Sequence, residues 1–296
     1  MLEGLAYMYM FCSDDPSHLI PMSDNESSIY PVFDFDVANH CDLFVLGGGE
    51  LINTDRLFIR PFLHWIDQIK VPKVILGCGV NAESYDQLKP HVKEDLEKFS
   101  YIGLRDKRSY EILKSIESLK DKVYLFYDPS ISLGIKYNLL NDRSDNAVVI
   151  PTDRFTNKYD KGIQQFNIVN KSKDWLKEKL KDYNSIKFLA FGHQDNNDLL
   201  TCKSLAKEFM NLHIRIIDEL SPFEAMQIIS KSAMAYPYRL HGLILSLLTG
   251  TKYEHYPYHW KLDRVHETFK GKTSTQILIE FMNQWSAFQN LAWNKK

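Results

Sequence analysis

Paired-cysteine patterns and the features typical of a signal peptide are not seen in this sequence. Its four cysteines form neither a C-x-x-C pair nor a metal-ligand spacing; they are Cys12, Cys41, Cys78 and Cys202. Scattered cysteines of this kind are typical of reduced thiols in a cytoplasmic protein. Segment 1–11 has no basic region and no small-residue cleavage site, which argues against a signal peptide. We therefore expect a cytoplasmic protein.

Long apolar runs and blocks of positive charge are missing too. No apolar stretch approaches the ~20 residues needed to cross a bilayer, so we expect no membrane span. The sequence has 36 basic and 38 acidic residues, a formal net charge of −2, and no dense lysine or arginine block. Charge alone therefore argues against binding to nucleic acid or to an anionic membrane.

The glycine signatures of dinucleotide and Walker-type nucleotide sites are absent, but another glycine motif is present. Gly47-Gly48-Gly49-Glu50 directly follows a strand-like segment, 42–46. Glycines at the carboxyl end of a strand let the backbone turn sharply and approach a ligand closely. The alternative is a tight turn packed against the neighbouring strand. Glu50 is then either a solvated carboxylate or an acid/base group.

Strand-like and helix-like patterns alternate along the chain, as in parallel sheets with crossover helices. The predicted strands cover 5–11, 42–46, 73–76, 101–104, 123–127, 147–150, 186–191, 213–217, 233–238 and 252–256. The predicted helices cover 54–69, 91–98, 108–115, 173–182, 199–210, 222–230 and 242–249. Segment 138–146 is polar and separates two halves. We expect an α/β protein of two doubly wound, Rossmann-like domains, 1–141 and 142–262, with a cleft between them.

A further helix is indicated near the C-terminus. Thr273 and Gln276 have the spacing of a capping box. The apolar side chains that follow recur on one helical face; they are Ile277, Phe281, Trp285 and Phe288. Because this helix comes after the second domain is complete, we predict that segment 263–296 crosses back and packs on the first domain.

Polar side chains follow several predicted strands directly. They are Asn81, Arg105, Asp106, Asp128 and Arg154. The carboxyl ends of parallel strands share one edge of a sheet, where ligands of such folds bind, so we expect these residues at the cleft. As alternatives, Asp106 is only a helix cap beside a surface arginine, and Asp128 is only a turn residue.

The segment Tyr238-Arg239-Leu240-His241-Gly242 lies where a buried strand gives way to a short buried helix that Gly250 ends. The N-terminus of a helix offers free N–H groups and positive potential. Two cationic-capable side chains beside it indicate a phosphate or carboxylate ligand. The alternative is that Arg239 pairs with a structural carboxylate and His241 caps the helix.

His255, His259 and His266 do not predict a metal site. Pro257 interrupts any helix that would align the first two, and no carboxylate stands at ligand spacing. Lys261 is interpreted as an anion contact, with a solvated surface lysine as the alternative.

Together these motifs resemble the polysaccharide pyruvyl transferase family from about Asp42 to Lys261. Asp42-Leu-Phe-Val-Leu-Gly-Gly-Gly resembles its D-x-hydrophobic-G-G-G element, and Asp128-Pro129 its D-P element. Arg105-Asp106, followed by Ser109 and Leu113, is similar to the family's R-D-x-x-S-x-x-x-L element. The C-terminal signature is matched by Glu224, Ser230, Tyr238-Arg-Leu-His-Gly-Leu-Ile-Leu and Lys261.

The resemblance implies a GT-B-like fold and transfer of pyruvate from phosphoenolpyruvate to hydroxyls of a sugar or lipid-linked glycan, forming a ketal and releasing phosphate. Phosphoenolpyruvate is the co-substrate, and no cofactor is expected. From these motifs and from the strand ends, the expected substrate-binding residues are Arg239, Leu240, Arg154, Arg105, Lys261, Gly47, Gly48, Gly49 and Asn81. His241 is the expected acid or phosphate-stabilising group, and Glu50, Asp106 or Asp128 the expected base. The family's first strand-turn-helix is expected to be missing from the N-terminal domain.

Two other functions fit the same architecture. One is a nucleotide-sugar glycosyltransferase. Such an enzyme needs a carboxylate that binds the donor ribose late in the second domain, and the one carboxylate in segment 253–260 is Glu254. The other is a non-catalytic sugar-phosphate-binding protein. The acceptor and the oligomeric state are not predicted.

Overall fold

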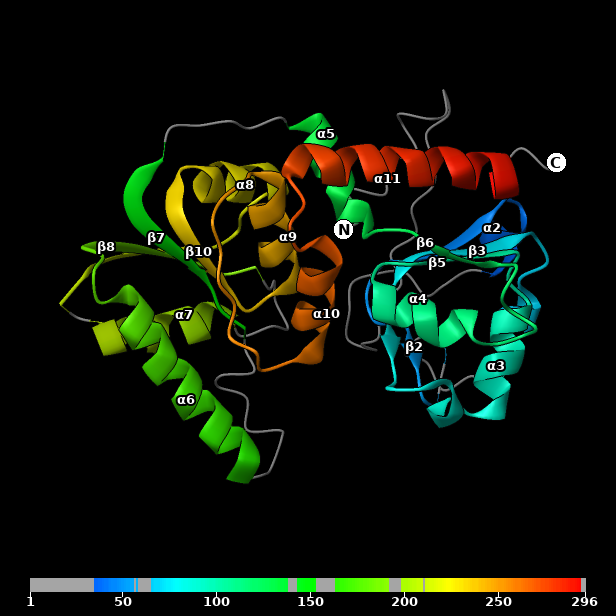
Figure 1. Ribbon diagram of the computed structural model, residues 1–296, viewed down its shortest axis with the longest axis horizontal. Coiled ribbons are helices and arrows are strands. Elements are labelled where there is room, and N and C mark those ends of the chain that lie inside the picture. The colour runs from blue at the N-terminus through cyan, green and yellow to red at the C-terminus, as the bar shows by residue number, and fades with distance from the viewer. Residues whose placement is uncertain are drawn as a thin grey trace. The chain divides into compact units, whose positions relative to one another are not determined.

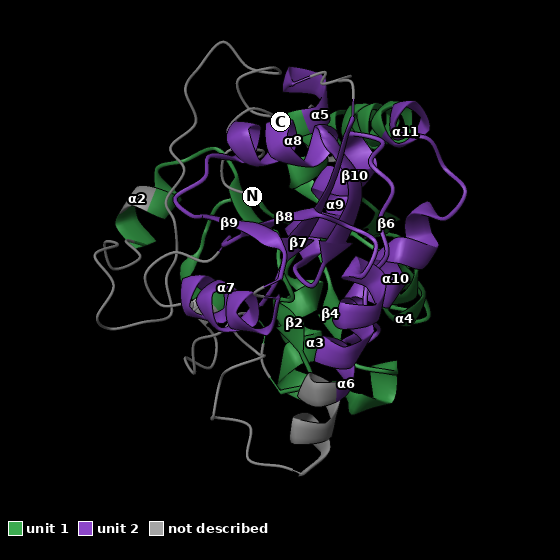
Figure 2. Ribbon diagram, turned by 90° about the vertical axis from the view of Figure 1, so that its left-hand side faces the viewer, with its two compact units in different colours: residues 1–133, 278–296 green, residues 134–277 purple. Residues whose placement is uncertain are grey.

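The computed structural model describes residues 35–55, 57, 65–137, 143–152, 163–191, 198–209 and 211–293. The chain divides into two compact units (Figures 1 and 2). Unit 1 comprises Met1–Leu133 with Leu278–Lys296, and unit 2 comprises Gly134–Ile277. Each unit contains a parallel sheet with helices packed on it, so the predicted α/β class is confirmed.

The main sheet of unit 1 is parallel and has the order β1-β3-β5-β6. Its strands are β1 (Phe44–Gly47), β3 (Lys73–Cys78), β5 (Tyr101–Leu104) and β6 (Val123–Leu125). Beside it, β2 (Ile52–Asn53) and β4 (Val80–Asn81) form a short parallel pair. Helices α3 (Pro90–Glu97) and α4 (Lys107–Lys114) pack on one face, where their apolar residues share a core with Ile75 and Ile102.

Shorter elements complete unit 1 and the link to unit 2. They are α2 (Phe35–Asn39), the 3₁₀ turns η1 (Trp65–Gln68), η2 (Tyr85–Gln87) and η3 (Pro129–Ser132), α5 (Leu133–Lys136) and the π-helical turn η6 (Gln289–Trp293).

The opposite face of this sheet is covered by α11 (Ser274–Phe288), as predicted from its apolar stripe. The Phe126 ring lies 5.8 Å from that of Phe281 and 6.3 Å from that of Trp285, between ring centroids. Phe288 packs edge-on against Tyr101 at 5.0 Å. The capping box also forms, since Thr273 N–H donates to Gln276 Oε1 at 2.8 Å and Gln276 N–H returns to Thr273 Oγ1 at 3.2 Å. Helix α11 is therefore part of the core of unit 1.

The sheet of unit 2 is parallel and has the order β10-β7-β8-β9. Its strands are β7 (Ser144–Ile150), β8 (Ser185–Leu189), β9 (His213–Ile217) and β10 (Ser232–Pro237). Helices α6 (Ile163–Leu180) and α7 (Asp198–Ala206), with the 3₁₀ turn η5 (Lys207–Phe209), cover one face. Helices α8 (Pro222–Ser230) and α9 (Leu240–Leu248) cover the other, and α10 (Trp260–Phe269) packs beside α9 (Figure 1).

Two predictions about local structure were wrong, and one helix was not predicted. In 54–69, of which 56 and 58–64 lie outside the described residues, the described helical part is η1 alone, because Ile52 pairs with Val80 and forms a bridge with Leu57. Segment 252–256 forms only a single bridge, between Ala235 and Tyr253, and not a strand. Helix α10 was missed, although His259 caps it and apolar residues recur at helical spacing; these are Leu262, Val265 and Phe269.

Candidate functional site

Unit 2 has a topological switch point between β7 and β10. From β7 the chain proceeds through β8 to β9 on one side, and β10 then pairs with β7 on the other. Ligands of open α/β sheets bind outside the carboxyl ends of the strands at such a point. The two strands end together there, since the Tyr238 N–H donates to the Ile150 carbonyl at 2.9 Å. Arg239 directly follows.

Arg239 occupies the N-cap position of α9, as the strand-to-helix interpretation predicted. Its backbone is extended (φ −102°, ψ 139°), and its side chain makes no capping hydrogen bond. The helix ends in a Schellman arrangement, with Gly250 at φ 62° and the Thr251 N–H donating to the Ser246 carbonyl at 3.0 Å. Gly242 brings α9 close to the sheet, because a Cβ there would stand 2.8 Å from Ile150 Cδ1.

The Arg239 side chain forms a fork with Asp198, the first residue of α7. Its Nε donates to Asp198 Oδ2 at 3.0 Å, and its Nη2 donates to Oδ1. Asp198 is completely buried, whereas 27% of the Arg239 side chain is exposed. Arg239 therefore pairs with a structural carboxylate, as the alternative interpretation proposed. The carboxylate orients the guanidinium while leaving part of it open to solvent.

His241 lies one residue after Leu240 in the first turn of α9. The imidazole is partly exposed, and its Nε2 atom is buried. The N-cap position is occupied by Arg239, so the alternative interpretation, in which His241 caps the helix, was wrong. Leu240, the first residue of α9, is buried, with 7% of the residue exposed.

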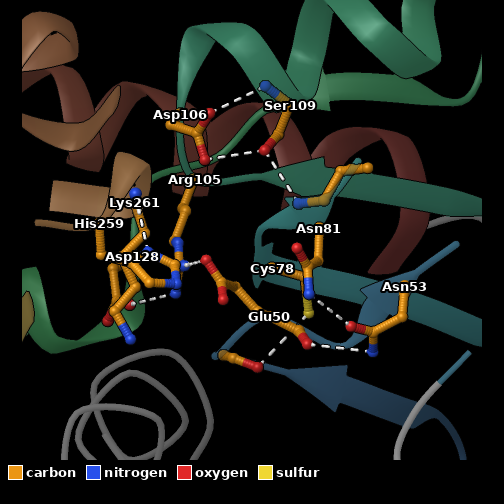
Figure 3. Close-up of polar contacts among 12 residues, drawn as sticks. Glu50, Asn53, Cys78, Asn81, Arg105, Asp106, Ser109, Asp128, His259 and Lys261 are labelled. Atoms are coloured by element: carbon orange, nitrogen blue, oxygen red, sulfur yellow. Dashed lines mark hydrogen bonds and ion pairs between the residues drawn. The ribbon is translucent and has the colours of Figure 1, made fainter. Parts of the chain in front are cut away.

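Lys261 lies in the first turn of α10, where its N–H donates to His259 Nδ1 at 3.3 Å (Figure 3). The other two histidines point to neighbours within unit 2. His255 Nε2 is 2.8 Å from Asp263 Oδ1, and His266 Nδ1 is 2.8 Å from the Tyr253 hydroxyl. Burial, and then the neighbouring His255, lower the pKa of His266. Arg154 lies outside the described residues.

In unit 1 the glycine turns bring two strand ends together. Gly48 and Gly49 follow β1 with φ of 72° and 79°, a left-handed backbone that glycine adopts without strain. The Gly48 N–H donates to the Leu76 carbonyl at 3.0 Å, and the Gly79 N–H donates to the Gly49 carbonyl at 2.8 Å. The motif is therefore a turn closed against the next strand, as its alternative interpretation held.

Arg105 is buried beneath these turns, with 3% of its side chain exposed (Figure 3). Its Nη2 lies 3.4 Å from Glu50 Oε1, and its Nη1 lies 4.0 Å from Asp128 Oδ2. Its Nε has no hydrogen-bond partner among the described residues. Gly79 makes room for the guanidinium, because a Cβ there would come within 2.9 Å of Nη2. The surface arginine of the alternative interpretation is thus a buried residue instead.

Asp106 and Asp128 both act as caps, as their alternatives proposed. Asp106 is the N-cap of α4, and its two oxygens accept from the Ser109 N–H and hydroxyl, each at 2.8 Å. Asp128 caps η3, and its Oδ1 accepts from the Ser130 N–H at 3.0 Å and hydroxyl at 2.7 Å. Both carboxylates are buried, whereas 17% of the Glu50 side chain is exposed.

The remaining polar groups of unit 1 lie around the same strand ends. Asn81 donates from Nδ2 to Asn53 Oδ1 at 3.0 Å, which joins the ends of β4 and β2. Cys78 lies under the glycine turn, and burial raises the pKa of its thiol to about 12. Gly47 is the last residue of β1.

The predicted site residues therefore fall into two groups, one in each unit. Unit 1 brings together Glu50, Arg105 and Asp128 around the glycine turn, with Asp106 and Asn81 on the adjoining strand ends. Unit 2 brings Arg239, Leu240 and His241 to the start of α9, with Lys261 on α10. Sequence reasoning missed Asp198, although an acid just before the predicted helix 199–210 was an available signal.

Comparison with solved structures places both units in a known architecture. A protein from Listeria monocytogenes assigned as a UDP-N-acetylglucosamine 2-epimerase aligns with a TM-score of 0.50 and 9% identity, over 85% of this chain and 69% of that one. The UDP-GlcNAc 2-epimerase from Neisseria meningitidis gives 0.46 and 13%, over 87% and 73%. Heptosyltransferase WaaC from E. coli gives 0.36 and 12%, over 76% and 69%. The parallel α/β sheet in each unit and the Listeria alignment agree on a GT-B-like fold with two Rossmann-like domains.

The sequence defines the class more narrowly than the fold does. The family model for polysaccharide pyruvyl transferase matches residues 7–252, most of the chain. The protein belongs to this family, and it is a transferase. No curated protein matches it. Among the described residues, none of the helices has the length and apolar character needed to cross a membrane.

Proposed function

We propose that the protein transfers the pyruvyl group of phosphoenolpyruvate to two hydroxyls of a glycan, forming a cyclic ketal and releasing inorganic phosphate. The observation that carries this proposal is the start of α9, where Arg239 and His241 follow β10 at a switch point. Phosphoenolpyruvate is a compact anion with a carboxylate and a phosphate. Cationic side chains and helix N–H groups are the donors that such a ligand requires.

The reaction needs an acid, a base and stabilisation of the departing phosphate. A proton adds to the methylene carbon of phosphoenolpyruvate, and the oxygen of the first sugar hydroxyl bonds to the adjacent carbon as that hydroxyl loses its proton. The second hydroxyl oxygen then bonds to the same carbon while the carbon–oxygen bond to phosphate breaks. Its proton leaves with the base or the phosphate. The acceptor gains pyruvic acid less one water.

We assign donor binding to unit 2. Arg239 holds a carboxylate or phosphate oxygen through its planar guanidinium, which an ammonium group cannot imitate. His241, next in the same helical turn, donates the proton or stabilises the leaving phosphate. Lys261, at the start of α10, adds positive charge on this side.

We assign the acceptor side to unit 1, with Glu50 as the base. Asp106 and Asp128 are buried, and their oxygens hold helix caps, so using either as a base would break local structure. Glu50 is more exposed and lies beside the Arg105 guanidinium. The side chains named here supply the cations, the acid and the base, so the proposal includes no cofactor beyond phosphoenolpyruvate. Dependence on this metabolite fits a cytoplasmic protein.

The test is release of phosphate from phosphoenolpyruvate in the presence of a panel of glycan acceptors, with products weighed by mass spectrometry. We expect phosphate release that depends on acceptor, and a product heavier by pyruvic acid less water. Arg239→Lys should weaken donor binding in calorimetry by at least roughly tenfold, with a Kd that can still be measured. Arg215→Lys is the matched control, because Arg215 is exposed on β9, at the far edge of the sheet from β10.

Three results would reject the proposal. One is transfer of a sugar from a nucleotide-sugar donor with no reaction from phosphoenolpyruvate. A second is phosphoenolpyruvate binding without turnover on any acceptor, as expected of a non-catalytic binding protein. The third is unchanged donor affinity in folded Arg239→Lys, which would remove Arg239 from the site.

A further inference from the structure

Asp198 is the most completely buried charged partner of the proposed donor site. It opens α7, and its exposure is 0%. Both of its oxygens accept from Arg239, Oδ2 from Nε at 3.0 Å and Oδ1 from Nη2. Two parallel hydrogen bonds from one edge of a guanidinium fix the plane of the group as well as its position.

The location of Asp198 explains how a carboxylate can be held there. The N-terminal turn of a helix supplies N–H donors and positive potential, which favour a negative charge. Helix α7 is itself anchored to the sheet by buried Cys202 and Leu205. The carboxylate is therefore attached to the core of unit 2, while 27% of its partner side chain remains exposed.

We propose that Asp198 is a positioning residue that locks the Arg239 guanidinium in the orientation that binds the anionic donor. This inference depends on the proposed function, in which Arg239 binds phosphoenolpyruvate. A free arginine side chain has considerable rotamer entropy, which binding would have to overcome. Because the fork to Asp198 orders the side chain during folding, this cost does not fall on donor binding.

This role differs from that of a structural ion pair. A pair that served stability alone would leave donor affinity unchanged once the variant had folded. A positioning residue changes the Kd and KM for the donor and leaves the chemical step nearly intact, because it touches neither substrate nor reacting atoms.

The experiment compares Asp198→Asn, Arg239→Lys and the double variant, with Asp182→Asn as the matched control at an exposed turn. Calorimetry measures binding of phosphoenolpyruvate and of inorganic phosphate, and steady-state kinetics separates KM from kcat. Asp198→Asn keeps the shape but loses the charge that holds the fork. We expect it to raise the Kd and KM for phosphoenolpyruvate roughly tenfold, the scale of a charge-assisted hydrogen bond, with kcat changed less than about threefold.

The double variant supplies the decisive comparison. If Asp198 acts through Arg239, donor affinity in the double variant equals that of Arg239→Lys alone, because the effects are not additive. Additive losses, or wild-type affinity in folded Asp198→Asn, would overturn the inference. Wild-type affinity in Arg239→Lys would instead reject the proposed donor site.

Folding is checked by native-state labelling of Cys202, one helical turn after Asp198 in α7. If Asp198→Asn leaves Cys202 open to labelling, Asp198→Glu replaces it, since this variant keeps the charge and displaces it by one methylene. A raised donor Kd at unchanged kcat then supports the positioning role. The inference is overturned if folded Asp198→Glu has the wild-type Kd for the donor, and if adding Asp198→Glu to Arg239→Lys produces purely additive effects on that Kd.

Discussion

Arg105 in unit 1 and Arg239 in unit 2 both follow the end of a parallel strand, yet their surroundings are opposite. The Arg105 side chain is 3% exposed, and its ion-pair contacts among the described residues are long, 3.4 Å to Glu50 and 4.0 Å to Asp128. Arg239 is 27% exposed and is held by a fork to a buried carboxylate. Packing holds the first arginine, and hydrogen bonds hold the second. Only the second is both fixed and accessible, as a residue that binds a ligand must be.

The two sheets explain part of this difference. In unit 2 the strand order reverses between β7 and β10, and Arg239 follows one of those two strands. In unit 1 the described strands follow in one direction, from β1 through β3 and β5 to β6. Arg105 there lies under turns whose backbones close over it, with Gly79 against its guanidinium. We expect substitutions in unit 1 to affect stability more than donor affinity, and those at α9 to do the reverse.

The largest expected effect on stability belongs to Trp285 in α11. Its side chain is 4% exposed and packs against Phe126 and Phe288, with ring centroids at 6.3 Å and 5.3 Å. Trp285→Ala should lower the free energy of unfolding by roughly 3–5 kcal/mol, the usual cost of such a cavity. Denaturant titration measures this loss. Ile279→Ala is the matched control, since Ile279 lies on the same helix and is 56% exposed.

The labelling rates of two buried thiols show which unit Trp285→Ala destabilises. Burial raises the pKa of Cys78 in unit 1 and of Cys202 in unit 2 to about 12. Near pH 8 each folded thiol is almost entirely protonated and shielded, so labelling reports local opening. Trp285→Ala should speed labelling of Cys78 more than that of Cys202. Equal acceleration at both thiols would contradict the assignment of α11 to the core of unit 1.

The next effect is on turnover. His241→Asn should lower kcat by roughly 10²-fold or more, the scale expected for a lost proton donor or a lost oxyanion contact. The fold should persist, because buried residues on either side of His241 hold α9. His213→Asn is the control, because His213 is an exposed residue of β9, and its kcat should match that of wild type. Near-normal turnover combined with a large loss of stability would show that His241 serves only the helix.

A smaller effect on stability tests the close packing of Arg105. Gly79→Ala places a Cβ within 2.9 Å of Arg105 Nη2, so the guanidinium must shift. We expect a loss of about 1–3 kcal/mol, typical of overpacking. Gly271→Ala is the comparison, because Gly271 has φ 77° and nothing within 4 Å, so its cost is backbone strain alone. A Gly79→Ala protein as stable as wild type would show that the Arg105 side chain has room to move.

The features predictable from sequence were those encoded by neighbouring residues. The predicted limits of β5, β9 and α8 agree with the structure, since apolar runs and the Ser221 capping box set those limits locally. The turn at Arg239 followed from the strand, the helix and Gly250 in the same way.

Features that depend on distant residues could not be predicted. Arg239 meets Asp198 from 41 positions away, and no local pattern pairs them. The burial of Arg105 depends on the missing Cβ of Gly79, and the extended path of Ile52–Asn53 depends on pairing between β2 and β4. Sequence therefore identified the strand ends that carry the site. It could not establish which of their side chains are caps, core residues or accessible groups.

The smallest expected effect comes from Ser221, the cap of α8 in unit 2. Its hydroxyl accepts from the Glu224 N–H at 3.2 Å, and its own N–H donates to Glu224 Oε2 at 2.9 Å. Ser221→Ala should cost about 1 kcal/mol. It should speed labelling of Cys202 and leave Cys78 unchanged, the reverse of the Trp285→Ala pattern.

The same cap predicts a dependence on pH. Hydrogen bonds from the Ser221 backbone and then its hydroxyl lower the pKa of Glu224 below 4.5. A carboxyl whose pKa is lower in the folded state stabilises the protein above its unfolded pKa, and this stabilisation is lost as pH falls through the folded value. The difference between wild type and Ser221→Ala should therefore shrink below about pH 4, by denaturant titration at each pH. A difference that stays constant from pH 7 to pH 3 would show that the Ser221 hydroxyl caps α8 without help from the Glu224 charge.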